Sequence, residues 1–181
     1  MAKAYQIDDQ KEAYYMTFTV VGWADVFTRQ IYRDIIIESF DYCRKEKGML
    51  LYAYVVMSNH VHVVMESARG DLSGLVRDFK KHTSKRILKE VQENSIESRR
   101  DWLLTVFEYH AKYNKKNGKY QLWTNDNHAV EMSRNGVIKT KIDYIHNNPV
   151  RAGWVQKEEE YLYSSASNYY GNGGLIAIDF V

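Results

Sequence analysis

The strongest constraint on the fold is a pair of strand-like segments that are joined by a very short connection. Residues 49–57 (MLLYAYVVM) and 61–67 (VHVVMES) are rich in β-branched, aromatic and other apolar residues, and the connection between them is short and polar. This composition favours strands, and a short connection requires the two strands to run antiparallel. The sequence therefore predicts a β-hairpin over residues 49–67.

Apolar periodicity and turn residues place the other elements around this hairpin. The segment 13–23 (AYYMTFTVVGW) predicts a buried first strand, and 120–132 predicts another strand or an irregular edge segment. Helices are predicted over residues 28–48, closed by Gly48, over 70–91, begun by Asp71 or Ser73, and over 134–147. This order predicts an α+β fold in which helices pack on an antiparallel sheet.

Length and composition limit the class of protein to which this sequence can belong. The chain has 181 residues, of which 45% are hydrophobic, and this suits one globular domain with a sizeable core. Its single cysteine, Cys43, excludes an internal disulfide and fits a reducing interior. We find no leader sequence and no apolar run long enough to cross a membrane, so we expect a cytoplasmic protein. The net charge of +2 alone does not indicate a nucleic-acid-binding protein.

Two histidines, His60 and His62, share one face of the second hairpin strand, because alternate residues of a strand point the same way. Val61, Val63 and Met65 then point into the core. Two adjacent imidazoles can bind one divalent metal, although such a pair can equally form a solvated or hydrogen-bonded face. Further cysteine or histidine ligands for zinc are not obvious. A mixed nitrogen and oxygen site suits magnesium or manganese better.

The only proline, Pro149, follows the last predicted helix. The residue before a proline is disfavoured in helical geometry, so the helix is predicted to end or kink at Asn147 or Asn148. Asn148 could then cap a short turn that Gly153 closes. Tyr144 and Asn148 lie four residues apart, and they share one helical face if the helix extends that far.

The densest basic cluster is RDFKKHTSKR, residues 77–86. At helical spacing, Arg77, Lys81 and Lys85 form one stripe with Lys80 beside it. Such a stripe can be a solvated helix face, or it can contact DNA phosphates without reading the sequence. Outside this cluster, Arg151 could contact a phosphate and Trp123 could stack on an unpaired base, although both could be structural.

Three segments together resemble a known family. NHVHVV (59–64) resembles the HUH motif, histidine–hydrophobic–histidine, of single-tyrosine DNA transposases. DYIHNNPVRAGWV (143–155) is similar to the signature of one branch, the REP-associated tyrosine transposases, and LWTNDNHAVEM (122–132) is similar to their tryptophan-containing strand. The likeness spans residues 14–154.

This resemblance implies a ferredoxin-like two-layer sandwich, the fold of HUH endonucleases, as a single domain over 1–181. Its core would cover about residues 13–155, with 92–119 as an insertion and 156–181 as a C-terminal extension. It implies that His60 and His62 bind Mg²⁺ or Mn²⁺ with Asn148 as third ligand, that Tyr144 is the nucleophile, and that His128 assists the metal or contacts DNA.

The implied substrate is single-stranded DNA with hairpins or palindromic repeats, and a homodimer is left open. Attack by a tyrosine on a phosphodiester gives a 5′-phosphotyrosine and a free 3′-hydroxyl, and a second 3′-hydroxyl can reverse this step without ATP. The sequence is also compatible with three alternative functions. The first is a domesticated hairpin-binding protein that does not cut, the second is a zinc protein unrelated to DNA, and the third is a rolling-circle initiator or relaxase.

Overall fold

The computed structural model describes residues 6–113, 118–132 and 135–180, and of residues 135 and 136 it describes the backbone alone. Its centre is a four-stranded antiparallel sheet with the strand order β2-β3-β1-β4. The strands are β1 (Tyr14–Thr19), β2 (Met49–Val56), β3 (His60–Ser67) and β4 (Val130–Glu131). The predicted α+β fold with an antiparallel sheet is confirmed.

Strands β2 and β3 form the predicted hairpin. Their register runs from the pair Met49–Ser67 to the pair Val56–Val61, with one irregularity between Leu51 and Ala53. The first strand is shorter than the prediction, because the chain leaves the sheet after Thr19 and forms a 3₁₀ turn, η1 (Val21–Trp23).

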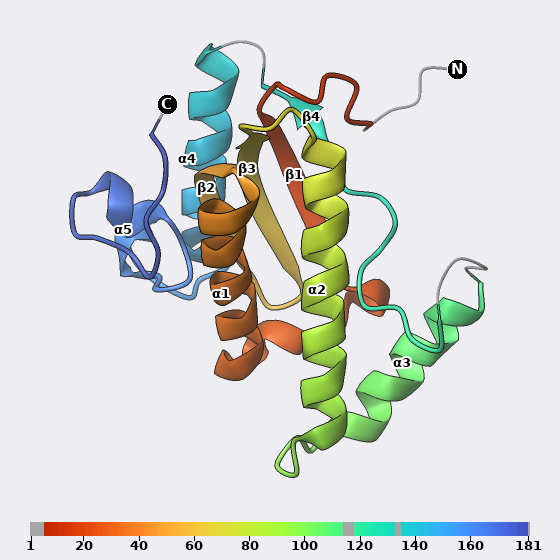
Figure 1. Cartoon of the computed structure of the whole chain (residues 1–181). Helices are drawn as coiled ribbons and strands as arrows, with labels where there is room; N and C mark the ends of the chain where they lie inside the picture. The colour runs from red at the N-terminus through yellow and green to blue at the C-terminus, as the bar shows by residue number, and fades with distance from the viewer. Residues whose placement is uncertain (1–5, 114–117, 133–134, 181) are drawn as a thin grey trace.

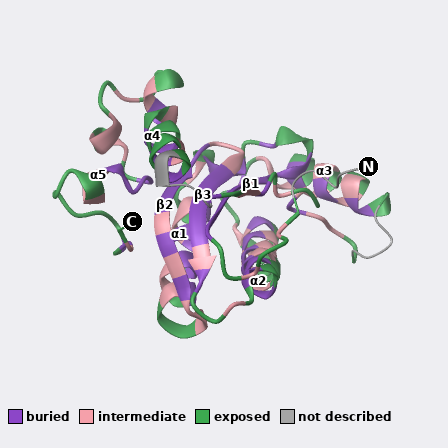
Figure 2. Cartoon of the chain, turned by 90° about the horizontal axis from the view of Figure 1, so that it is seen from above, coloured by how far each residue is buried: buried purple, intermediate pink, exposed green. Residues whose placement is uncertain are grey.

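Helices cover both faces of the sheet, as Figures 1 and 2 show. On one face, α1 (Gln30–Lys47) and α2 (Leu72–Glu93) enclose the larger core, in which the rings of Phe40 and Phe79 stack with centroids 4.7 Å apart. On the other face, α4 (Asn135–Arg151) packs Ile142 and Ile145 against Tyr15 and neighbouring sheet residues. The helix α4 thus adds a layer to the two-layer sandwich.

The ends of α1 and α2 follow the predicted capping residues. Gly48 terminates α1 with a left-handed φ of 71°, a conformation that is strained for other residues. Asp71 begins α2, where its carboxylate accepts a hydrogen bond of 2.9 Å from the backbone N–H of Gly74.

The segment 92–119, which the resemblance implies to be an insertion, contains a helix, α3 (Arg100–Lys112). It buries Leu103, Phe107 and Ala111, and the first two belong to the larger core. None of the helices in the described ranges is long and apolar enough to span a membrane.

The prediction that the last helix ends at Asn147 or Asn148 is wrong, because α4 runs through Pro149 to Arg151. A proline inside a helix removes one backbone hydrogen bond, at a cost of about 3 kcal/mol. The apolar packing of α4 on the sheet offsets this loss. The backbone hydrogen bond from Ala152 to Asn148 continues the helical pattern beyond the proline. Gly153, with a φ of +74°, then terminates the helix, and the N–H of Trp154 donates to the oxygen of Pro149 as in a glycine C-cap.

The C-terminal segment wraps back onto β2 and includes η3 (Glu158–Glu160) and α5 (Ala166–Tyr169). Ser164 forms an isolated bridge with Val55. The carboxylate of Asp179 accepts a hydrogen bond of 2.9 Å from the backbone of Leu51, and Ile178 is buried in the larger core. The segment therefore contributes to the packing of the sheet.

Candidate active site

The two predicted histidines lie at the start of β3, on the sheet face that α4 covers. The ring centroids of His60 and His62 are 4.6 Å apart and their planes are 73° from parallel. His62 is 6% exposed, and His60 is half-buried. The alternation of β3 thus brings both imidazoles together while Val61 and Val63 enter the larger core.

Asn59 fixes the protonation pattern of His60. Its side-chain Nδ2 donates to the backbone oxygen of Trp23 at 3.3 Å, and its Oδ1 lies 2.7 Å from Nδ1 of His60. Because Oδ1 can only accept, the Nδ1 of His60 must carry the proton. Its Nε2 then holds the lone pair that a metal requires.

His62 is oriented by two hydroxyl groups of β1. The Tyr15 hydroxyl and Oγ1 of Thr17 each lie 2.9 Å from Nδ1 of His62. Thr17 and His62 face one another across the β1–β3 pair, and Tyr15 lies two residues away on the same face. Sequence analysis missed both residues, although the alternation of the segment YYMTF places them on one face.

Burial lowers the pKa of His60. Burial and, to a smaller extent, the charges of His60 and Lys141 lower the pKa of His62 to about 3. At neutral pH both imidazoles are therefore uncharged, as ligands of a metal must be.

Tyr144 of α4 stands directly beside this pair. Its ring centroid lies 5.6 Å from that of His62 and 6.3 Å from that of Tyr15, and the residue is 37% exposed. Two cations flank it. Nζ of Lys141 is 5.8 Å and Cζ of Arg151 is 5.2 Å from the ring centroid of Tyr144. The structure thus brings a phenol, two imidazoles and two positive charges to one place.

Asn148, the expected third ligand, donates a hydrogen bond of 3.0 Å from its side-chain Nδ2 to the backbone oxygen of Tyr144. A metal would therefore use its Oδ1, and this role stays a prediction. Within the described ranges, no group of three or more His, Cys, Asp or Glu side chains is arranged to hold a metal. Two neutral imidazoles and one amide oxygen fit the mixed nitrogen and oxygen site that the sequence predicts.

His146 of α4 has a structural role. It is buried, and its Nε2 lies 2.8 Å from Oγ of Ser165 in the C-terminal segment. Burial lowers its pKa to about 4, so the ring is neutral at pH 7.

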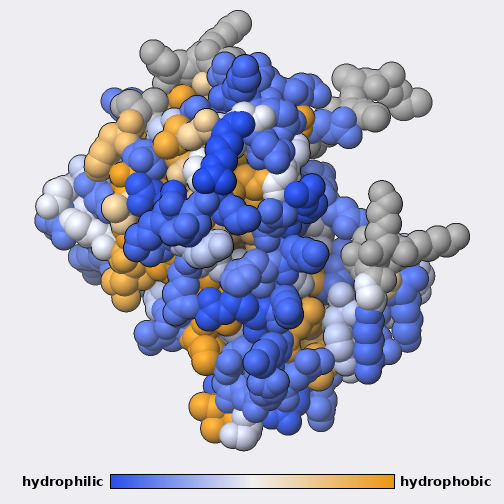
Figure 3. Space-filling model, viewed as in Figure 1, coloured by the Kyte–Doolittle hydropathy of each residue, from blue (hydrophilic) through white to orange (hydrophobic). Residues whose placement is uncertain are grey.

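The basic cluster lies on α2, and therefore on the other side of the sheet from Tyr144 (Figure 2). Arg77, Lys81 and Lys85 are exposed there. In the view of Figure 3, hydrophilic side chains cover the face that α2 presents. Between α2 and residues 119–125 runs an open groove of about 640 Å³, which these three residues and Lys119 help to line.

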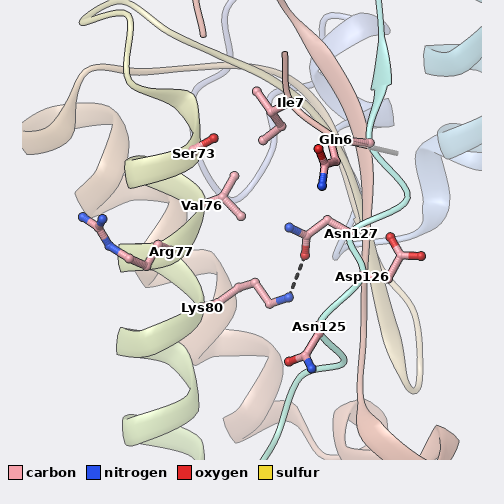
Figure 4. Close-up of a pocket in the computed structure, with 10 residues that line it drawn as sticks. Gln6, Ile7, Ser73, Val76, Arg77, Lys80, Asn125, Asp126 and Asn127 are labelled. Carbon is pink, nitrogen blue, oxygen red and sulfur yellow. Dashed lines mark hydrogen bonds between the residues drawn. The ribbon is translucent and has the colours of Figure 1, made fainter. Parts of the chain in front are cut away.

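Lys80 differs from the other cations of the cluster because it is held inside a neighbouring cavity of about 580 Å³. Its ammonium donates to the backbone oxygen of Thr124 at 2.7 Å and to Oδ1 of Asn127 at 2.6 Å. Figure 4 shows this side chain reaching from α2 toward Asn127, with Asp126 pointing away from it. Burial lowers the pKa of Lys80 to about 8, against a smaller opposing effect of Asp126.

Trp123 is a correction to the predicted DNA-contact residues. It is only 5% exposed, its ring stacks on Phe27 at 5.8 Å, and its Nε1 donates to Oγ1 of Thr83 at 3.0 Å. A base cannot stack on a ring that is enclosed in this way, so we assign Trp123 to the core.

His128 has a left-handed φ of 44°, and its Nε2 lies 3.8 Å from the carboxylate of Asp126. Its predicted role stays a prediction.

The model of one protein family, described as "Transposase IS200 like", matches residues 11–105, which is more than half of the chain. The chain belongs to the IS200-like transposase family. The match includes His60 and His62 but ends before Tyr144 and Asn148. The assignment of Tyr144 therefore depends on its position beside His62 and on the resemblance of its sequence segment.

Two solved structures are similar to this chain. One is a REP-associated tyrosine transposase bound to a REP hairpin, with a TM-score of 0.61 and 19% identity over 100% of this chain and 92% of that chain. This likeness supports the fold. The other is a candidate transposase from Deinococcus radiodurans R1, with a TM-score of 0.45 and 15% identity over 81% of this chain and 95% of that chain. No curated protein matches the chain.

Proposed function

We propose that this transposase cuts and rejoins single-stranded, hairpin-bearing DNA through a covalent 5′-phosphotyrosine at Tyr144. The observation that carries the proposal is the 5.6 Å separation of the Tyr144 and His62 rings. A partly exposed phenol beside two neutral imidazoles and two cations suits phosphoryl transfer to tyrosine, because cations stabilise the charge that develops on the phosphate.

In the proposed reaction, the hydroxyl oxygen of Tyr144 attacks the scissile phosphorus and loses its proton. A bond forms between this oxygen and phosphorus, and the bond from phosphorus to the 3′ oxygen breaks. The leaving 3′ oxygen keeps the electron pair and takes up a proton. A second 3′-hydroxyl reverses these steps, so strands are joined without loss of the phosphodiester energy.

The side chains around Tyr144 have separate roles in this proposal. Lys141 and Arg151 attract the phosphate and offset the negative charge that develops on it. Asn59 holds the His60 ring in place, and Tyr15 and Thr17 hold that of His62. A Mg²⁺ or Mn²⁺ ion held by Nε2 of both histidines, with Oδ1 of Asn148, would polarise the scissile phosphate.

Hairpin DNA is proposed as the substrate because the similar transposase of known structure is bound to a REP hairpin. The exposed cations of α2 would contact DNA phosphates on the far side of the sheet from Tyr144, and this positions DNA without reading its sequence. A DNA that reaches both surfaces has to pass around an edge of the sheet.

The test incubates the protein with a labelled pool of hairpin-bearing single strands and Mg²⁺ or Mn²⁺. A denaturing gel then shows whether label moves with the protein. We expect covalent labelling of the wild type and none of Tyr144→Phe, because phenylalanine lacks the attacking oxygen. His60→Ala should label weakly or not at all.

The control is Tyr42→Phe, which removes a hydroxyl from an exposed tyrosine of α1. It should label like the wild type. Binding of the pool without transfer, in either metal, would contradict cutting and support the hairpin-binding alternative. Labelling of Tyr144→Phe would assign the nucleophile to another residue.

The exposed cations of α2 should give DNA binding a steep dependence on salt. Replacing Lys81 and Lys85 together by Gln should weaken binding of every hairpin to a similar degree. It should also lower the slope of log affinity against log salt by about 1 for each phosphate that the variant no longer binds. Binding titrations at several salt concentrations measure this slope.

The matched control for these two lysines is Lys89→Gln. Lys89 lies one turn further along α2 and faces Glu93, with 3.8 Å between Nζ and the carboxylate. Its loss should leave the slope unchanged. An unchanged slope in the double variant would place the phosphate contacts elsewhere.

A further inference from the structure

Trp23 is the most exposed tryptophan of the described residues, and neither packing nor backbone preference accounts for it. Its side chain is 68% exposed, although an indole gains most by burial. Its φ is +54°, in the left-handed region that is strained for a bulky side chain, and it directly follows Gly22 at +64°. Strain of this kind persists only where surrounding structure enforces it, and it clusters at functional sites.

The surroundings of Trp23 do enforce this conformation. Its backbone N–H donates to the oxygen of Val20 at 3.2 Å, and its backbone oxygen accepts from Nδ2 of Asn59 at 3.3 Å. On the other side of the turn, a Cβ added to Gly22 would come within 2.9 Å of Val106 of α3. The close approach of α3 therefore leaves no room for a side chain at position 22 and fixes the turn that presents Trp23.

Asn59 also connects Trp23 to the candidate active site. The same amide that holds the backbone of Trp23 places its Oδ1 2.7 Å from Nδ1 of His60. Two hydrogen bonds through one side chain therefore connect the backbone oxygen of Trp23 to one of the two histidines beside Tyr144. A strand whose phosphate lies at His60 has neighbouring nucleotides within reach of this position.

We infer that Trp23 is a stacking site for an unpaired DNA base next to the scissile phosphate. The inference rests on the proposed function, because the strand must be single for a base to leave its own stack. A free indole face suits this task, since stacking of a base on an aromatic side chain tolerates any base. Fixing one flanking base on Trp23 would hold the phosphate in register with Tyr144.

The test measures binding of a fluorescent pool of random single strands, about 20 nucleotides long, and of a duplex of the same length. Trp23→Asn should bind the single strands about 5- to 150-fold more weakly and should bind the duplex as the wild type does. Trp23→Phe should keep most of the affinity, because it retains an aromatic face. Asparagine tolerates a positive φ, so the melting temperature of Trp23→Asn should equal or exceed that of the wild type.

The matched control is Trp102→Leu, which removes another exposed tryptophan, on α3. It should bind both pools like the wild type. An effect of Trp23→Asn below twofold on single strands would overturn the inference, as would equal losses for Trp102→Leu or on the duplex. Failure of the wild type to bind single strands would also overturn it.

The covalent labelling assay separates this inference from the proposed function. Loss of single-strand affinity in Trp23→Asn, without labelling of the wild type, would support the stacking site and reject cutting. Labelling of the wild type and of Trp23→Asn at equal rates, with equal affinities, would reject the stacking site alone.

Discussion

Replacing Tyr15 by Phe together with Thr17 by Val is expected to reduce strand transfer by about 10- to 100-fold, the usual effect of removing groups that orient a metal-binding histidine. Both hydroxyl groups lie 2.9 Å from Nδ1 of His62. Without them, a buried ring nitrogen loses its partners, and the ring can rotate or exchange its tautomer. The loss should therefore act on His62, because phenylalanine at position 15 keeps the ring that lies 6.3 Å from that of Tyr144.

Each single variant should lose much less than the double variant, because one hydroxyl can serve the nitrogen when the other is absent. The two effects are then not additive, as expected for groups that share a partner. The rate of covalent labelling at increasing Mg²⁺ or Mn²⁺ measures the effect, and the double variant should need more metal for half of its maximal rate.

Tyr14→Phe is the matched control for the β1 variants. Tyr14 is the neighbour of Tyr15 on the other face of β1, where its hydroxyl lies 3.1 Å from the carboxylate of Glu131. Its loss should leave the metal dependence unchanged. If the double variant transfers DNA within twofold of the wild type, hydroxyl groups of β1 do not position His62.

The elements that sequence analysis placed correctly are those with a local signal. The hairpin has two apolar strands and a short turn, α1 ends at a glycine, and α2 begins at a capping aspartate. Pro149 misled the prediction because its local preference was outweighed by the apolar packing of α4 on the sheet. Propensity gives way in this manner wherever tertiary packing opposes it.

In the candidate site too, sequence analysis placed the residues that have a local signal and missed those that depend on tertiary packing. Period-two alternation put His60 and His62 on one face, and helical spacing put Tyr144 near Asn148. The partners of the histidines could not be found in this way. Contact between Thr17 and His62 depends on the register of β1 against β3. No residue near either position encodes that register by itself.

Trp123 and Lys80 show a second limit of sequence analysis. The type of a residue indicates which contacts it can make, but not whether its side chain is exposed. An aromatic ring and a cation in a DNA-binding protein both suggest contacts with the ligand. The structure places the ring of Trp123 against Phe27 and ties the ammonium of Lys80 to Thr124 and Asn127. Whether such groups face solvent is decided by how segments far apart in the chain pack together.

Glu97→Ala is expected to lower the free energy of unfolding by about 1–3 kcal/mol, the cost of leaving a buried polar group, here the Tyr32 hydroxyl, without its partner. The side chain of Glu97 is fully buried. Its carboxylate accepts from the Tyr32 hydroxyl at 2.8 Å and from Nε of Arg99 at 3.0 Å, and it lies 3.0 Å from Nε of Arg29. Denaturant titration measures the loss. Glu93→Ala, on the exposed end of α2, should change stability by less than about 0.5 kcal/mol.

Unfolding by acid should also depend on the carboxylate of Glu97. Burial alone would raise the pKa of Glu97, but hydrogen bonds from Arg99 and Tyr32 outweigh it and hold the pKa at about 2. Because the folded pKa lies below the unfolded value of about 4.3, Glu97 stabilises the fold above that pH. This stability is lost as the pH falls from there toward 2, so Glu97→Gln should unfold less steeply with acid than the wild type. If Glu97→Gln and the wild type lose stability equally steeply with falling pH, Glu97 is not the source of this pH dependence.

The consequence of this prediction extends to the active site. Glu97 joins the polar segment before α3 to Arg29 and Tyr32 at the start of α1, and α3 in turn packs its Val106 against the turn at Gly22. Loss of Glu97 should therefore loosen α3 and release the strained conformation of Trp23 before the sheet unfolds. Hydrogen exchange would then be faster in α3 than in β3 of Glu97→Gln. Uniform acceleration in both elements would show instead that α3 and the sheet open as one cooperative unit.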